Sequence, residues 1–230
     1  MQGQLGYFPT WVYTSVQRAT FPNFRGFWYG RAVRYRDRVI ERLDAHCDLA
    51  VRLSAVPEGT EVRGVYFRSV VDELARRGLS GAFTDVVGEA RRATFTLYPL
   101  ADYLVWIAFA GSLVTSPASV HEGMHELLRG NSKYFGESLL GRGLLRLISH
   151  DPVRQLHQAV QSKRTITNYG RWVITVEEPR HVEVRHEDEY VWIGSALAGA
   201  ARGGFEACGV EPQIEVRLED AYNGVLSFRW

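Results

Sequence analysis

The sequence predicts an α+β fold, in which an N-terminal helical layer is followed by a strand-strand-helix-strand-strand antiparallel sheet unit. Hydrophobic residues recur at three- and four-residue spacing from about residue 35 to residue 162, and at a spacing of two from residue 169 onward. Strands that follow a run of helices, rather than alternating with helices, are typical of α+β proteins with antiparallel sheets. We therefore expect an arm over residues 1–42 and one α+β domain over 43–230, helical in 43–165 and sheet-forming in 166–230.

The arm differs in composition from the rest of the chain. It holds ten aromatic residues, seven arginines and two acidic residues. Pro9, Pro22, Gly26 and Gly30 interrupt it, which predicts extended pieces and no continuous helix before about Val33. Aromatic rings interleaved with guanidinium groups suit packing onto the protein itself, docking on another protein, or contact with lipid or bases.

We expect the arm either to pack on its own domain or a second subunit, or to bind a protein partner. The net charge of the whole chain is +1, so no global field favours nucleic acid or anionic lipid, and we predict no nucleic-acid partner. The residues predicted to contact a partner are Trp11, Phe27, Trp28, Tyr29 and Arg31.

The helical part contains clear start and stop signals. An apolar stripe over residues 66–74 ends at Gly78, and the next helix is expected to begin near Ser80. Pro99 precedes a broad apolar face. Proline is tolerated in the first turn of a helix, so a helix is expected to begin there. This most hydrophobic window, 97–114, carries Asp102 and is too short to span a bilayer, so it predicts a buried helix and no transmembrane segment.

Two further helix starts are indicated by capping residues. Ser119 with Glu122 three residues later matches a capping box. Asp151 followed by Pro152 places an N-cap residue before a proline at the first helical position. We expect helices to begin at both places.

The last third of the chain reads as two hairpins around a helix. Residues 172–176 and 182–186 alternate on either side of the Pro179-Arg180 turn, and residues 214–218 and 225–229 alternate around Tyr222-Asn223-Gly224. The intervening GSALAGAARGGFEACG segment is rich in alanine and glycine, which predicts a helix lying close against the sheet.

Two stretches resemble a family of uncharacterised paralogous proteins from myxobacteria. They are RLSAVPEGTEVRGVYFRSVVDEL (52–74) and a segment from Thr96 to Pro152 that ends in GNSKYFGESLLGRGLLRLISHDP. The resemblance covers roughly residues 43–230. Because the family has no established activity, the resemblance indicates the class of protein but not its function.

The C-terminal unit also resembles, in the order of its elements, the fold of haem-nitric-oxide sensors, vinyl-reductase-type ligand-binding domains and TRAPP subunits. That resemblance implies a cavity between helices and sheet for haem, a small ligand or an acyl chain. Haem sensors of this fold carry a Tyr-x-Ser-x-Arg motif, and the nearest string here, Tyr13 to Arg18, has the wrong spacing. We therefore expect no haem and no other cofactor.

One motif suggests metal chemistry. His121, Glu122 and His125 form H-E-x-x-H, which on a helix places two imidazoles on one face for zinc and supplies a glutamate as general base. No third ligand follows at a spacing typical of zinc hydrolases, so chance occurrence near a helix start is the favoured interpretation and no metal is expected. A zinc-dependent hydrolase remains the alternative function.

We predict a non-catalytic binding or regulatory protein. Cys47 and Cys208 are far apart and the N-terminus has no signal-peptide pattern, which indicates a cytoplasmic protein with reduced thiols. The protein is expected either to hold a small apolar ligand between helices and sheet or to dock on a protein partner. The predicted pocket residues, which would equally serve as ordinary core, are Tyr103, Trp106, Phe109 and Tyr134.

Overall fold

In the computed structural model, eight α-helices and two antiparallel sheets form the described part of the chain, which comprises the backbone of residues 25–88, 90–137 and 151–230 and the side chains of 35–88, 90–132 and 151–230. The helices are α1 (Arg25–Cys47), α2 (Leu49–Ala55), α3 (Val65–Arg76), α4 (Ser80–Val87), α5 (Leu100–Val114), α6 (Val120–Glu137), α8 (Pro152–Ile166) and α9 (Ala198–Ala207). A 3₁₀ turn, η1 (Pro117–Ser119), precedes α6, and a π-helical turn, η2 (Ile193–Leu197), precedes α9.

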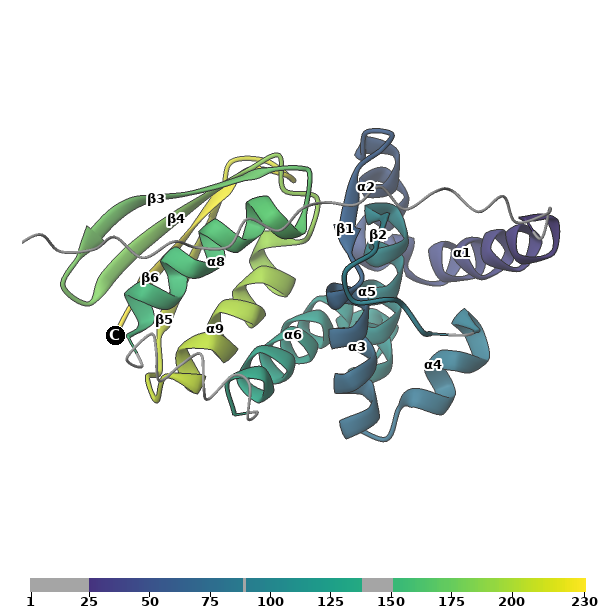
Figure 1. Ribbon diagram of the computed structural model, residues 1–230, viewed down its shortest axis with the longest axis horizontal. Coiled ribbons are helices and arrows are strands. Elements are labelled where there is room, and N and C mark those ends of the chain that lie inside the picture. The colour runs from purple at the N-terminus through teal and green to yellow at the C-terminus, as the bar shows by residue number, and fades with distance from the viewer. Residues whose placement is uncertain (1–24, 89, 138–150) are drawn as a thin grey trace, which may run out of the picture.

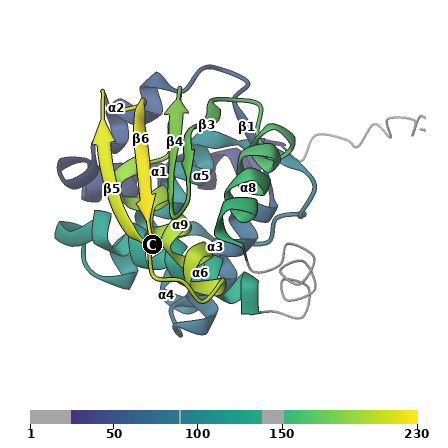
Figure 2. The ribbon, with the colours of Figure 1, turned by 90° about the vertical axis from the view of Figure 1, so that its left-hand side faces the viewer.

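The sheets confirm the predicted fold class. Strands β3 (Arg171–Glu178), β4 (His181–Glu187), β5 (Gln213–Leu218) and β6 (Gly224–Arg229) form one antiparallel sheet in the order β3-β4-β6-β5. A short second sheet pairs β1 (Glu61–Arg63) with β2 (Leu97–Pro99). Helices α8 and α9 lie on one face of the four-stranded sheet (Figure 1), and Figure 2 shows its strands side by side with helices behind them.

Helix α5 forms the centre of the helical layer. Eleven of its fifteen residues are buried, because its sequence is apolar on every side and α1, α2, α3, α4 and α6 surround it. Trp106 lies between the rings of Phe67 and Phe83 at centroid distances of 4.9 and 5.2 Å, both edge to face. Phe83 in turn stacks on Phe109 at 5.7 Å. These rings tie α3 and α4 to α5.

The sequence predicts that α9 lies close against the sheet. In the structure, its closest approach is to another helix, α6. A Cβ atom at Gly199 would overlap the carbonyl oxygen of His125, and one at Gly203 would overlap that of Arg129. The two glycines lie four residues apart and face the same side of α9, so they allow its backbone to contact the backbone of α6. The glycines of this alanine- and glycine-rich helix thus allow the contact with α6 that connects the sheet part to the helical layer.

Several helix boundaries match the sequence signals. Helix α3 ends at Arg76, shortly before Gly78 with its φ of +72°, and α4 begins at Ser80, so the predicted stop and the predicted start are confirmed. The Asp151 carboxylate accepts a hydrogen bond from the backbone N–H of Val153 at 2.9 Å, which confirms the predicted start of α8.

One predicted boundary is wrong, and one predicted boundary is right without its predicted capping interaction, since α6 begins at Val120, directly after Ser119. Helix α1 begins at Arg25 and runs through Gly26 and Gly30, so a continuous helix starts eight residues before Val33; its isolated glycines weaken a helix without ending it. In place of a Ser119 capping box, the Ser116 side chain accepts from the Ser119 N–H at 3.3 Å and caps the 3₁₀ turn η1.

Within the described residues, no single helix has the length and apolar composition needed to cross a membrane. The segments Leu100–Val114 and Pro117–Ser132 meet that requirement only as a pair, and the chain bends by 116° between them.

Candidate functional site

A hollow between the helices and the sheet has a volume of about 710 Å³, and we call it the interlayer cavity. It is bounded by α3 and α6 on the helical side, by α8 and α9, and by the inner face of the sheet. Most of its lining is apolar. Besides the residues discussed below, the lining includes Leu128, Leu156, Val160, Val184, Leu197, Phe205, Leu226 and Phe228.

A buried carboxylate organises the polar end of this cavity. Glu189 is 0 % exposed and accepts hydrogen bonds from Lys163 Nζ at 2.7 Å, from Trp172 Nε1 at 2.7 Å and from the Val191 N–H at 3.0 Å. The three donors come from three different segments of the chain, namely α8, β3 and the loop after β4. The three donors compensate the cost of burying the carboxylate.

The partner cation is equally enclosed. Lys163 is 3 % exposed, and its ammonium lies 3.6 Å from the ring centroid of Tyr169 and 5.2 Å from that of Trp172. Burial lowers the pKa of Lys163, and the adjacent Glu189 carboxylate opposes that shift. The ammonium is thus bound by one carboxylate and two aromatic faces. Because the Glu189 carboxylate neutralises its charge, the pair has no net positive charge that would attract another anion.

His186 lines the same cavity and has no hydrogen-bond partner within the described residues. It is 3 % exposed, and neither ring nitrogen is bonded, although the edge of Trp172 lies against the ring at a centroid distance of 5.0 Å. Burial lowers the pKa of His186 to about 4. The imidazole is therefore neutral at pH 7, with one N–H donor and one acceptor nitrogen unused.

Two tyrosines from the helical layer complete the polar end. Tyr66 and Tyr103 line the cavity with their rings edge to face at 5.3 Å. Burial raises the pKa of both phenols, and the nearby Glu189 carboxylate adds to the rise. Neither hydroxyl bonds to another described residue. The cavity therefore presents neutral, unused hydrogen-bonding groups from both the helices and the sheet.

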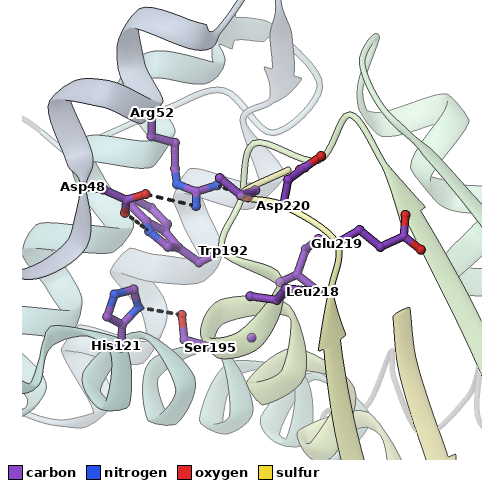
Figure 3. A pocket seen from close by; sticks show the side chains of 11 residues that line it. Asp48, Arg52, His121, Trp192, Ser195, Leu218, Glu219 and Asp220 are labelled. Atoms are coloured by element: carbon purple, nitrogen blue, oxygen red, sulfur yellow. Dashed lines mark hydrogen bonds and ion pairs between the residues drawn. The ribbon is translucent and has the colours of Figure 1, made fainter. Parts of the chain in front are cut away.

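A second hollow of about 600 Å³ lies where α2 meets η2 and the turn after β5 (Figure 3), and we call it the junction hollow. Arg52 crosses it: one guanidinium nitrogen donates to the carbonyls of Tyr190 and Ala221 at 3.0 and 3.1 Å, while the group lies 4.8 Å from the Trp192 ring centroid. Asp48 accepts from Trp192 Nε1 at 3.1 Å and pairs with Arg52 at 3.5 Å. These contacts join α2 to the sheet part.

The H-E-x-x-H segment borders the junction hollow but does not assemble a metal site. His121 Nδ1 lies 3.2 Å from the Ser195 hydroxyl, whereas His125 Nδ1 lies 3.2 Å from Glu126 Oε1. No group of three His, Cys, Asp or Glu side chains in the described ranges could hold a metal ion. Gly123, inside the motif, meets Gly111 of α5 backbone to backbone. The zinc-hydrolase alternative is therefore not supported.

The predicted pocket residues separate into different environments. Tyr103 lines the interlayer cavity, while Trp106 and Phe109 belong to the aromatic cluster of the helical core and are at most 2 % exposed. The Tyr134 side chain lies outside the described residues. So do Trp11 and the side chains of the other predicted partner residues, Phe27, Trp28, Tyr29 and Arg31, whose backbone is part of α1.

Apart from Tyr103, sequence reasoning missed the residues at the polar end of the cavity, although signals for two of them exist. His186 is the third member of the Val182, Val184, His186 series on the buried side of β4. Lys163 continues the α8 stripe of Leu156 and Val160 at helical spacing, so a lysine occupies an apolar position. A polar residue on a buried face needs a partner or a ligand, which was the available clue.

Comparison with known proteins shows which family the chain belongs to. The family model described as protein of unknown function (DUF2378) matches residues 55–230, so the chain is a member of this family. None of the curated proteins matches the sequence.

Solved structures with the same fold belong to H-NOX proteins. The Fe(II) unliganded H-NOX protein from K. algicida is 13 % identical, with 73 % of this chain and 95 % of that chain covered and a TM-score of 0.56. The Fe(II)NO form of an H-NOX protein from S. oneidensis is 7 % identical, with 73 % and 98 % covered and a TM-score of 0.52. An H-NOX structure from a study of haem distortion is 15 % identical, with 73 % and 92 % covered and a TM-score of 0.50. This likeness extends well beyond the C-terminal unit in which it was predicted.

The described residues do not fit the haem of those relatives. His186 has free ring nitrogens, but a haem also brings two propionates that need cations or several donors. Of the described cavity-lining cations, Lys163 is paired with Glu189 at 2.7 Å and Arg68 with Asp72 at 3.5 Å. The charge balance of the cavity thus disfavours a dianionic group.

Proposed function

We propose that the protein is a non-catalytic binding protein of the cytoplasm that holds a small, largely apolar molecule in the interlayer cavity. The cavity itself carries the proposal: its volume of about 710 Å³ falls within the roughly 300–1,000 Å³ of typical ligand pockets. Its walls are mainly apolar, with polar groups at the end near Glu189 and further ones, such as Ser69, Asn131 and Gln155, on α3, α6 and α8. A mainly apolar site with some polar groups can bind an apolar ligand and orient it. The H-NOX-like fold supports a binding role by analogy.

Docking on a protein partner through the arm remains a prediction. Residues 1–24 lie outside the described structure, and the side chains of residues 25–34 do as well. The cavity is therefore the better supported of the two mechanisms.

A matched pair of substitutions on α8 tests the cavity. Ala159 lines it, whereas Gln158, the next residue toward the N-terminus, is exposed. Ala159→Phe should fill part of the cavity and weaken binding of Nile red, a neutral fluorescent probe, at least tenfold. Gln158→Phe adds the same ring at the surface and should leave the affinity unchanged. Equal affinity of the wild type and both variants would refute the proposal.

Native mass spectrometry of the purified protein, compared with its denatured mass, is the measurement that identifies a natural ligand. Mass retained only under native conditions, and reduced in Ala159→Phe but not in Gln158→Phe, would assign that molecule to the cavity.

A further inference from the structure

The charges around the interlayer cavity limit what it can bind. Three of its described lining residues are charged, namely Arg68, Asp72 and Lys163. Lys163 is neutralised by the buried Glu189, and Arg68 pairs with Asp72 on the exposed surface of α3, where their side chains are 63 % and 54 % exposed. Among the described residues, a charged ligand group at the buried end would meet no unpaired counter-charge. Burying such a charge is strongly unfavourable.

The hydrogen-bonding groups left free at that end are all neutral. His186 contributes one donor and one acceptor, and the hydroxyls of Tyr66 and Tyr103 each contribute both. A buried polar group without a partner costs free energy, and a ligand that bonds to it recovers that cost. The ring nitrogens of His186 are buried, so a ligand group that bonds to them must displace the atoms that cover them.

These groups come from opposite walls. Tyr66 and Tyr103 belong to α3 and α5, whereas His186 belongs to β4. A single polar group placed between them would bond to both layers at once. The remaining, apolar part of the same molecule would then extend along α8 and α9, where the walls are aliphatic and aromatic.

Building on the proposed function, we infer that the ligand is an uncharged, mainly apolar molecule whose hydroxyl, carbonyl or amide group bonds with His186 and the two tyrosines. Carboxylates such as fatty acids, and amines, are disfavoured because the charges of the described lining residues are already paired. This gives the cavity a chemical selectivity that its apolar walls alone would not provide.

The test compares three probes with the same chain: 1-octanol, octanoate and octylamine, each displacing Nile red from the full-length protein at pH 7.5. Octanol should displace the dye at a concentration at least tenfold below those of octanoate and octylamine. His186→Leu should weaken octanol binding about tenfold, or 1.4 kcal/mol, the change expected for one lost hydrogen bond. Tyr103→Phe removes only a hydroxyl and should weaken octanol binding in the same direction.

The outcomes separate this inference from the proposed function. Failure of Nile red itself to bind would overturn both. Displacement by octanoate as strongly as by octanol would overturn the inference alone, and loss of that displacement in Arg68→Gln would place the anion at the cavity rim. Octanol binding that is unchanged in both His186→Leu and Tyr103→Phe would also overturn it, since the polar groups would then play no part.

Discussion

The two hollows between helices and sheet use their polar groups in opposite ways. In the junction hollow, Arg52 donates to two backbone carbonyls and pairs with Asp48, which also accepts from Trp192. His121 contacts the Ser195 hydroxyl. In the interlayer cavity, both ring nitrogens of His186 are buried without a hydrogen-bond partner, and the hydroxyls of Tyr66 and Tyr103 form no hydrogen bond with another described residue. Polar groups that bond one another hold a structure together, whereas polar groups left free in an apolar cavity are suited to a ligand. The first hollow is therefore a structural connection, and the second is the one that we propose as a binding site.

The largest effect should come from the buried ion pair beside the cavity. Glu189→Gln leaves the Lys163 ammonium buried without a counter-charge and should lower the free energy of unfolding by about 3–5 kcal/mol, as measured by urea denaturation. The double variant Lys163→Met, Glu189→Gln should recover a large part of this loss. Asp72→Asn breaks an exposed pair of the same type and should cost no more than about 1 kcal/mol. Equal losses at Glu189 and Asp72 would contradict the importance given to burial.

The second effect concerns pH and His186. The unfolded protein protonates this histidine near pH 6.5, while the folded protein resists protonation until about pH 4. The unfolded state therefore binds more protons in that window, and stability falls as the pH is lowered through it. The contribution amounts to about 3 kcal/mol between pH 7 and pH 4. Lys163 and Glu189 act on the ring with opposite signs.

Urea unfolding of wild type and His186→Leu at several pH values isolates this contribution, because other titrating groups are common to both proteins. The stability difference between the two should widen by about 3 kcal/mol from pH 7 to pH 4. A constant difference would show that His186 titrates normally in the folded protein.

In the junction hollow, Arg52→Ala removes two hydrogen bonds and the packing on Trp192. We expect a loss of about 2–3 kcal/mol in urea unfolding, and little change in Nile red affinity. Arg52→Lys keeps the charge but loses the planar guanidinium that packs on Trp192 and pairs with Asp48 through a second nitrogen, so it should also destabilise. Arg38→Ala, at an exposed position of α1, serves as the control and should change stability by less than about 0.5 kcal/mol. Loss of Nile red affinity in a folded Arg52→Ala protein would contradict the assignment of a structural role to the junction hollow and a binding role to the interlayer cavity.

The smallest effect has the opposite sign. At pH 7, His186→Leu replaces an unpartnered polar ring by an apolar side chain and should raise the free energy of unfolding by about 1–2 kcal/mol. The same variant should bind octanol less tightly. A simultaneous gain in stability and loss of affinity is the pattern expected of a residue kept for binding. A loss of stability instead would indicate that the imidazole has a bonding role in the unliganded protein.

Local signals predicted much of the fold. The alternation on β4, the stop at Gly78 and the start at Asp151 each depend on neighbours within a few residues, so the sequence displays them directly. The start of α1 was missed because glycines lower helix propensity without deciding the outcome. The Ser119 capping box failed because a 3₁₀ turn capped by Ser116 precedes α6.

The candidate site was harder to predict because its members come from distant segments. Lys163 and Glu189 lie 26 residues apart, and Tyr66 reaches the same end of the cavity from α3. Aromatic spacing identified Tyr103 but gave Trp106 and Phe109 equal weight, although these two pack in the helical core. Periodicity shows which face of a helix is buried, and it carries no information about whether that face meets a cavity or a neighbouring ring.

The contact of Gly199 and Gly203 with α6 has a consequence for how the chain unfolds. Only hydrogen atoms separate the two backbones at these positions. No flexible side chains lie between them that could adjust to a partial separation, so α9 cannot move away from α6 without losing the contact. We therefore expect the helical part and the sheet part to lose their structure together. Tryptophan fluorescence and far-ultraviolet circular dichroism should then report one coincident urea transition, and two separate transitions would show that the halves are independent folding units.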